Sequence, residues 1–325
     1  MPRSIARLLL ILSLVTCLDA GAADRDAQRA AAATAVANDA PDCKAVQPFY
    51  WEIGDRNGRL AGASAGGDTP NAATAMPVAS ASKWFYGAYV AQRQKGHLSE
   101  ADVRALSMRS GYVSLQYGAC IRLLPKRQNS ETVAECLQSR GNDKYSAEDL
   151  GHFFYNGGHF QHHAAVDMAL GAMNNQALHD EISRQIGSDI HFSYDSPQLA
   201  AGVSIDAANY AQFLRKLLRG ELLLGSMLGA DAVCTNSTTC SDAVSAPIPE
   251  RSSWHYSLAH WIEDDPQTGD GSFSSPGAFG FYPWIDASKT YYGVLARHEL
   301  SAKAAFNSVL CGSAIRKAWL GAQKG

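Results

Sequence analysis

Residues 76–90 read Met76-Pro-Val-Ala-Ser-Ala-Ser-Lys-Trp-Phe-Tyr-Gly-Ala-Tyr-Val90, a run of small residues followed by a nearly all-apolar helical segment. We expect a helix to begin at Ser80, which places Lys83 one turn further along the same face. The amine of Lys83 then comes within reach of the Ser80 hydroxyl. The start of a helix also offers unpaired backbone N–H groups and the positive end of the helix dipole. This arrangement favours a serine nucleophile, because an acceptor for its proton and donors for the developing charge are both in place.

The Ser80/Lys83 pair also has a simpler interpretation, in which Ser80 caps the helix and the Lys83 stem lies along its surface. The residues that follow favour the catalytic interpretation. From Trp84 to Val90 the segment has almost no polar face, and a helix that is apolar on every side is buried. A buried lysine needs a partner or a lowered pKa, and a lowered pKa is the state that a catalytic amine requires.

Length and composition describe a globular protein with a substantial core. The chain has 325 residues, of which 46% are hydrophobic, which suits one large domain or two interleaved ones. The formal net charge of −3 gives no reason to expect a nucleic acid or an anionic membrane as partner. No apolar run outside the N-terminus is long enough to span a bilayer.

Residues 1–23 have the pattern of a secretory signal peptide. Arg3 and Arg7 precede an apolar run from Leu8 to Val15, and Ala20-Gly21-Ala22 offers a small-residue cleavage site. The apolar run is too short for a membrane anchor. We therefore expect the mature protein to be periplasmic or secreted.

The chain has seven cysteines, and removal of the signal takes away only Cys17. An even number in an exported protein indicates disulfides, and six cysteines allow fifteen pairings. Among these we expect Cys43–Cys311, Cys120–Cys136 and Cys234–Cys240. The sequence contains no Cys-x-x-Cys motif, so a redox or zinc-binding role for the cysteines is disfavoured.

The rest of the chain has strand-rich ends around a helical middle. An aromatic stretch from Phe49 leads to the hairpin turn Asn57-Gly58, and strand patterns return only between Trp254 and Ala296. Ala302–Trp319 has the pattern of an amphipathic helix. We expect an α+β fold, in which an antiparallel sheet is flanked by the N- and C-terminal helices and carries an inserted all-helical lobe. The expected parts are a flexible alanine-rich leader (24–42), a sheet domain (43–97 plus 245–325) and the helical insertion (98–244).

This plan resembles the serine β-lactamase and penicillin-binding-protein superfamily, most closely its class C β-lactamase and esterase branch. The resemblance rests on Ala79-Ser-Ala-Ser-Lys83 after a hairpin, on the helical insertion and on the late pair of strands, and it covers roughly residues 45–320. It implies an α/β sandwich of the β-lactamase/transpeptidase type. It also implies that Ser80 is the nucleophile and that Lys83 is the amine that helps to activate it.

The second motif of this superfamily, Tyr-x-Asn or Ser-x-Asn, has its candidate in Phe153-Phe-Tyr-Asn-Gly-Gly158, where two registers compete. If Asn156 is the motif Asn, Phe154 stands where a Tyr or Ser belongs. If Tyr155 is the motif Tyr, a glycine takes the Asn position, which suits esterase-like members that keep the Tyr and lose the Asn. We favour the second register, in which the Tyr155 phenol relays a proton with the catalytic amine. Tyr155 as a plain core aromatic is the alternative.

The third motif, usually Lys-Thr-Gly or His-x-Gly, has its place at Ser274-Ser-Pro-Gly-Ala-Phe-Gly280. Gly277 would let a substrate approach the backbone closely. The N–H groups of Ala278 and Ser80 would form the oxyanion hole.

Ser275 stands where the third motif normally has a cation. In the superfamily that cation attracts the carboxylate of a β-lactam or of a peptide terminus. Its absence favours neutral esters or amides, unless Arg297 and His298 at the end of the next strand replace it. We expect Ser275, Gly277, Ala278 and Asn156 to form the substrate-binding set.

Three histidines, His159, His162 and His163, crowd the start of one predicted helix. His159 and His163 share a face that would suit zinc, but a third ligand is speculative and no Glu follows His159 as a metalloprotease would need. We therefore expect polar helix positions and no metal site. A Ser-His-Asp triad is disfavoured, because Ser80 lacks a Gly-x-Ser-x-Gly turn.

The sequence thus predicts a secreted serine hydrolase that acts on an ester or amide carbonyl through an acyl-enzyme on Ser80, with Lys83 and Tyr155 as the proton relay. The expected partner is a small-molecule ester, amide or peptide substrate, and no metal or organic cofactor is implied. One alternative is a β-lactamase or D,D-peptidase of the same fold. Another is a non-catalytic ligand-binding protein on this scaffold, which the irregular second and third motifs keep open.

Overall fold

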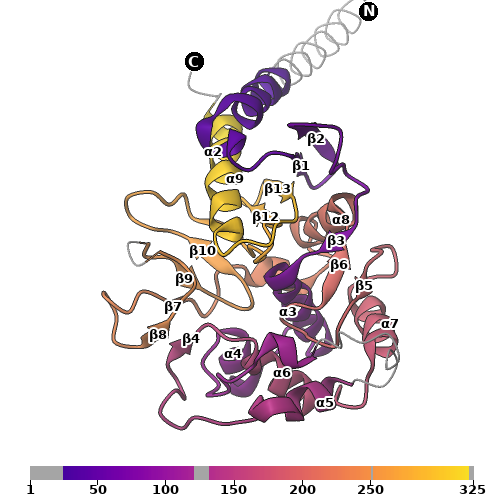
Figure 1. Ribbon diagram of the computed structural model, residues 1–325, viewed down its shortest axis with the longest axis vertical. Coiled ribbons are helices and arrows are strands. Elements are labelled where there is room, and N and C mark those ends of the chain that lie inside the picture. Colours follow the sequence, from indigo (N-terminus) through magenta and orange to yellow (C-terminus); the bar gives the residue numbers. More distant parts are fainter. Residues whose placement is uncertain (1–24, 121–131, 250–251, 322–325) are drawn as a thin grey trace, which may run out of the picture.

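The computed structural model describes residues 25–120, 132–249 and 252–321, and an antiparallel sheet lies at its centre (Figure 1). The sheet has eight strands in the order β2-β1-β13-β12-β11-β10-β9-β7. Their bounds are β1 Phe49–Asp55, β2 Arg59–Ala65, β7 Val233–Cys234, β9 His255–Tyr256, β10 Trp261–Glu263, β11 Ser272–Ser274, β12 Tyr282–Ile285 and β13 Tyr291–Ala296. Because β1 pairs with β13, the two ends of the chain meet in the middle of one sheet, as the sequence predicts.

Helices cover both faces of the sheet, and the alternation of side chains along β13 shows which helix takes which face. The Tyr291 ring packs edge-on against Trp319 of the C-terminal helix α9 (Ala304–Gly321), with centroids 5.7 Å apart. The next residue, Tyr292, accepts a hydrogen bond of 2.8 Å from Arg215 of α8 (Ala207–Leu218). The predicted α+β class is therefore confirmed, and α8 of the insertion covers the face opposite α9.

The alanine-rich segment behind the expected signal is a helix over residues 25–39, not a flexible leader. Ala33 and Ala37 are fully buried, and Arg29 donates a hydrogen bond of 2.8 Å to the Tyr291 hydroxyl. Alanine is the strongest helix former and its small side chain permits close packing, so this segment needs no large apolar residue to dock. The signal peptide itself lies outside the described residues. Within them, no helix is both long and apolar enough to cross a membrane.

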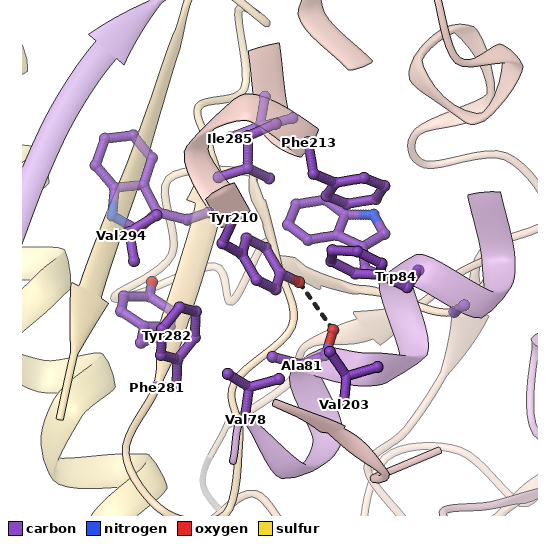
Figure 2. Close-up of a cluster of buried hydrophobic side chains, with 14 of the residues drawn as sticks. Val78, Ala81, Trp84, Val203, Tyr210, Phe213, Phe281, Tyr282, Ile285 and Val294 are labelled. Carbon is purple, nitrogen blue, oxygen red and sulfur yellow. Dashed lines mark hydrogen bonds between the residues drawn. The ribbon is translucent and has the colours of Figure 1, made fainter. Parts of the chain in front are cut away.

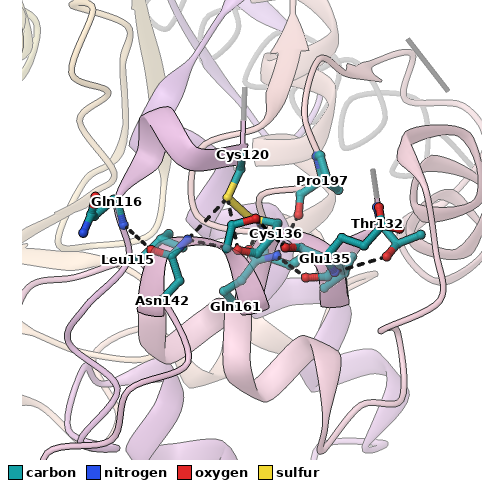
Figure 3. The surroundings of a disulfide bond; sticks show 12 residues. Leu115, Gln116, Cys120, Thr132, Glu135, Cys136, Asn142, Gln161 and Pro197 are labelled. Carbon is teal, nitrogen blue, oxygen red and sulfur yellow. Dashed lines mark hydrogen bonds between the residues drawn. A yellow bond between two sulfur atoms is a disulfide. The ribbon is translucent and has the colours of Figure 1, made fainter. Parts of the chain in front are cut away.

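The three disulfides are the pairs expected from the sequence. Cys43–Cys311 ties α2 (Pro41–Lys44) to α9 with a Cα–Cα distance of 4.7 Å. Cys120–Cys136 and Cys234–Cys240 close short segments of the insertion. Around Cys120–Cys136, Asn142 donates to the Cys136 carbonyl at 3.0 Å and accepts from the Gln116 N–H, which packs this corner of the lobe (Figure 3).

The segment quoted at the outset forms a 3-10 turn, η1 (Ala79–Ala81), followed by α3 (Ser82–Arg93). Its residues from Ser82 to Ala91 are all buried, as the absence of a polar face predicts. Figure 2 shows why the turn cannot shift freely: the hydroxyl of Tyr210 on α8 donates to the Ala81 carbonyl at 2.8 Å. The core under the sheet therefore holds the start of this helix in place.

The insertion is mainly helical, but it also contains short strands, which corrects the all-helical prediction. Its helices are α4 Glu100–Leu106, α5 Val133–Gln138, α6 Gly158–Ala165, α7 Asn175–Ile186 and α8, with 3-10 turns η2 Tyr117–Cys120, η3 Ser139–Gly141 and η4 Leu223–Met227. Its further strands are β4 Phe153–Phe154, which pairs with β8 Ala243–Ser245, and β5 Ser193–Tyr194, which pairs with β6 Val203–Ile205. The strand β6 also pairs with β3 Met76–Pro77. Strands of two or three residues are too short to show a period of two in the sequence.

Candidate active site

Ser80 lies in the 3-10 turn η1, immediately before α3, and Lys83 lies in the first turn of α3. The Lys83 amine is 2.9 Å from the Ser80 hydroxyl oxygen and 3.0 Å from the carbonyl oxygen of Ala200. The preceding residue, Ala79, has a left-handed backbone with φ of 44°, which costs an L-residue about 1 kcal/mol. Such strain is retained where the surrounding structure fixes a functional conformation.

The Lys83 side chain is 0% exposed, and both of its hydrogen-bond partners are uncharged. Burial lowers the pKa of this amine from 10.5 to about 7. A large fraction of Lys83 is therefore neutral near pH 7, and a neutral amine has a lone pair that can accept the Ser80 proton across the 2.9 Å contact.

Tyr155 follows β4, and its backbone N–H donates to the Ser245 carbonyl at 2.9 Å. Its ring centroid lies 4.9 Å from the Lys83 amine, and the ring stacks on Trp261 with centroids 5.2 Å apart. Burial raises the pKa of the Tyr155 phenol to about 12, although hydrogen bonding to Ser80 and Trp261 acts in the opposite direction. The phenol thus keeps its proton at neutral pH and can donate a hydrogen bond to the Ser80 hydroxyl.

Asn156 does not join these residues. Its side-chain oxygen accepts the backbone N–H groups of Leu115 at 3.0 Å and Gly158 at 2.8 Å, so it fixes the loop before α6. Of the two registers for the second motif, the structure places Tyr155 beside Lys83 and gives Asn156 a structural contact in place of the expected substrate-binding one.

Two members of the expected substrate-binding set, Ser275 and Gly277, hold backbone segments together. The Ser275 hydroxyl donates to the Ser80 carbonyl at 3.0 Å and is buried. A Cβ at Gly277 would lie 2.2 Å from the Val78 carbonyl oxygen, so this glycine permits close approach of the chain itself and not of a substrate. Ala278 does line the cavity that Ser80 faces.

That cavity has a volume of about 770 Å³ and opens in front of Ser80 and Tyr155. Its walls are mostly apolar and come from five parts of the chain. The lining residues include Pro77, Ala79, Asp195, Ala201, Gly202, Ile248, Trp254, Trp261, Ala278, Phe279, His298, Phe306 and Val309. Of the described residues that line it, Asp195 is the one with a carboxylate, and none is a lysine or arginine.

The two residues proposed to replace the missing cation are only partly suited to that task. His298 lines the cavity, but Arg297 is buried beside it, pairs with Glu299 and lines a separate hollow. The sequence reasoning missed Asp195 and the walls formed by Trp254 and Phe306. No motif marks these residues, because they reach the cavity through the packing of distant segments.

The histidine cluster is structural within the described residues, where no group of three potential ligands could hold a metal ion. Nδ1 of His159 accepts from the Ser110 backbone N–H, and Nε2 donates to the Phe154 carbonyl. Burial lowers the pKa of His159 to about 4. His163 lies between Asp102 and the Tyr86 hydroxyl. The sequence predicts that these histidines lie on the polar face of the helix, but His159 and His163 are buried and hydrogen-bonded inside the insertion.

Comparison with known proteins identifies the fold. A scan against protein-family models finds no match, and a search of curated protein sequences finds no significant one. Among solved structures, the chain is similar to a penicillin-binding protein from Bacillus halodurans, with a TM-score of 0.58 and 12% identity over 82% of this chain and 96% of that one. It is also similar to a β-lactamase from Mycobacterium bovis, with a TM-score of 0.55 and 14% identity over 84% of this chain and 96% of that one. A D-stereospecific amidohydrolase from Streptomyces sp. matches with a TM-score of 0.55 and 15% identity over 90% of this chain and 98% of that one. The chain therefore shares its fold with these penicillin-binding-protein, β-lactamase and amidohydrolase structures.

Proposed function

We propose that the protein is a serine hydrolase that cleaves an ester or amide through an acyl-enzyme on Ser80. One observation carries this proposal: a fully buried lysine with a lowered pKa lies 2.9 Å from a serine hydroxyl at the start of a helix. A buried amine without a counter-ion is costly to maintain in a core, and its benefit is a base that is neutral near pH 7. The fold, which is shared with β-lactamases and an amidohydrolase, supports the same reaction class.

In the proposed reaction, the Ser80 oxygen attacks the substrate carbonyl carbon while the Lys83 amine takes the hydroxyl proton. The tetrahedral oxyanion would accept hydrogen bonds from the N–H groups of Ser80 and Ala278, since both residues line the cavity. The Tyr155 phenol donates a proton to the departing alcohol or amine and regains one from the Lys83 ammonium. Water then attacks the acyl-enzyme with the same groups as base and acid, which releases the carboxylic acid and restores Ser80.

The cavity favours neutral substrates over carboxylates. Its described lining contains the carboxylate of Asp195 and no lysine or arginine, and Ser275 at the motif position is occupied with the Ser80 carbonyl. A substrate anion would therefore lose its hydration without gaining a charged partner. We infer small esters or amides with an apolar group, for which the aromatic and aliphatic walls provide contact area.

The decisive experiment is Ser80→Ala, measured by p-nitrophenyl ester hydrolysis and by covalent labelling with a fluorophosphonate probe. We expect both signals to disappear. Ser301→Ala is the matched control, because Ser301 lines the same cavity away from the start of α3. This variant should keep both signals. Labelling that persists in Ser80→Ala would place the nucleophile elsewhere and overturn the proposal.

The two alternatives lead to different results in parallel assays. A β-lactamase or D,D-peptidase would retain fluorescent penicillin covalently or release D-alanine from D-Ala-D-Ala peptides. A non-catalytic binding protein would bind such ligands with an intact fold and show no turnover and no labelling. Export to the periplasm or medium is part of the proposal, and the three disulfides support it. Fractionation of cells that express the full chain tests it.

A further inference from the structure

A chain of three buried polar side chains crosses the insertion behind the proposed site. The hydroxyl of Tyr86 on α3 is 2.7 Å from Nδ1 of His163 on α6, and Nε2 of His163 is 2.8 Å from the carboxylate of Asp102 on α4. All three side chains are at most 2% exposed. The proposed reaction uses none of them.

The protonation of this chain follows from its contacts. Burial raises the pKa of Asp102, but hydrogen bonds from His163, Ser99 and Gln94 outweigh burial and hold that pKa well below its usual range. The ionised Asp102 can only accept, so Nε2 of His163 donates to it, and Nδ1 of His163 is the hydrogen-bond partner of the Tyr86 hydroxyl. Every group is then satisfied, and such a network favours a single arrangement of the helices that it joins.

The helix α6 is linked to two of the groups around the Lys83 amine, the Tyr155 ring and the Ala200 carbonyl. Tyr155 lies three residues before α6, and Asn156 fixes that junction through its 2.8 Å bond from the Gly158 N–H. On α6 itself, the Gln161 amide donates to the Pro197 carbonyl at 2.8 Å (Figure 3). Pro197 begins the short segment that carries Ala200, whose carbonyl accepts from Lys83.

We propose that the Tyr86–His163–Asp102 chain is a positioning device, which holds α6 against α3 and so fixes Tyr155 and Ala200 around the Lys83 amine. Tyr86 is one turn beyond Lys83 on α3, so the chain joins the two helices close to the amine. These are positioning residues, because none of them contacts the cavity. The inference rests on the proposed function of Ser80 and Lys83.

The test uses two tyrosines of one helix as a matched pair. Tyr89 is as deeply buried on α3 as Tyr86, but its hydroxyl donates at 3.1 Å to Glu181 on α7, and α7 contributes no residue to the described lining of the cavity. Tyr86→Phe and Tyr89→Phe each remove one buried hydroxyl from α3. A purely structural role predicts the same result for both variants.

We expect Tyr86→Phe to lower kcat by about tenfold or more with KM unchanged, because small displacements of catalytic groups cost this much. The kcat of Tyr89→Phe should stay within about twofold of wild type, at a similar loss of melting temperature. Equal kcat values in the two variants would overturn the inference. If Tyr86→Phe fails to fold, Asp102→Asn measured against Glu181→Gln asks the same question.

Labelling separates this outcome from failure of the proposed function. If fluorophosphonate labels wild-type protein at Ser80 and the two variants have equal kcat, only the positioning role is wrong. If wild-type protein is neither labelled nor active, both the proposed function and the positioning role are wrong.

Discussion

Two cations among the described residues are at most 1% exposed, Lys83 at the cavity and Arg316 beneath the sheet, and their surroundings are opposite. Lys83 contacts a hydroxyl and a carbonyl. Arg316, which is 1% exposed, contacts the carboxylates of Glu263 at 2.7 Å and Asp270 at 2.8 Å. Although burial alone would lower it, these carboxylates and Tyr282 hold the pKa of Arg316 well above its ordinary value, whereas burial lowers that of Lys83 to about 7.

The comparison shows that burial does not by itself make a cation reactive. Paired with carboxylates, Arg316 keeps its proton and fastens α9 to β10 and to the loop before β11. Without a carboxylate, Lys83 gives up its proton more readily, which suits the base that the proposed reaction needs. The lowered pKa of Lys83 corresponds to roughly 5 kcal/mol against its charged form. One buried cation is therefore expected to matter for stability and the other for catalysis.

The largest effect should follow from Lys83→Met, which keeps an unbranched stem and removes the amine. We expect kcat/KM for p-nitrophenyl esters to fall by about 10³- to 10⁴-fold, because Ser80 loses its base. Stability should be unchanged or higher, since a buried amine is replaced by an apolar group. Near-normal activity of a folded Lys83→Met protein would remove Lys83 from the mechanism.

Arg316→Met should show the converse pattern. It leaves Glu263 and Asp270 without their partner, which we expect to lower the free energy of unfolding in urea by about 3–5 kcal/mol. Activity per folded molecule should be retained. Arg104→Met is the control, because Arg104 makes an exposed pair with Glu100 and its loss should cost less than about 1 kcal/mol. Similar losses in both variants would contradict the assigned role of Arg316.

Tyr155→Phe should have an intermediate effect on catalysis alone. The ring can still stack on Trp261, so folding and KM should change little, while loss of the phenolic proton should lower kcat by about a hundredfold. The loss should be greater for alkyl esters than for p-nitrophenyl esters, whose leaving group needs less protonation. An equal loss for both substrates would point to a packing role for Tyr155.

The smallest effect is the pH dependence that Lys83 imposes. Its neutral form is the active one, so kcat/KM should fall about tenfold for each pH unit below about 7 and level off above it. The free energy of unfolding should also rise with pH. Between about pH 7 and 10.5 the Lys83 amine is protonated in the unfolded chain but neutral in the folded one, so raising the pH favours the folded state; below about pH 7 both states are protonated and the contribution of Lys83 is constant. A flat rate profile between pH 5 and 8 would contradict the low pKa of Lys83.

The parts of the site within one helix were predictable from the sequence, because spacing fixes geometry there. The separation of Ser80 and Lys83 and the apolar run after them predicted both the contact and the burial. Tyr155 and Asn156 are adjacent residues just after the two-residue strand β4, so the sequence cannot decide between them. Only the structure shows which of the two side chains lies beside Lys83.

Features that depend on contacts between distant segments could not be predicted from the sequence. Ser275 and Gly277 were read as substrate contacts, but the Ser80 and Val78 carbonyls, almost two hundred residues away in sequence, occupy them. The helix over residues 25–39 was missed because alanine gives no amphipathic pattern, although it packs closely. Both errors have the same cause: the sequence of a segment does not show which distant segment packs against it.

The helix α9 has a consequence for how this protein could acquire new substrates. Cys311 near its middle and Arg316 in its second half fasten the helix, while its first turns present Phe306 and Val309 to the cavity. None of the proposed reacting groups is on this helix. Exchanges at Phe306 should therefore change the selectivity of the pocket without touching the proposed reacting groups, so the start of α9 is where substitutions could adapt the pocket to other ligands at least cost.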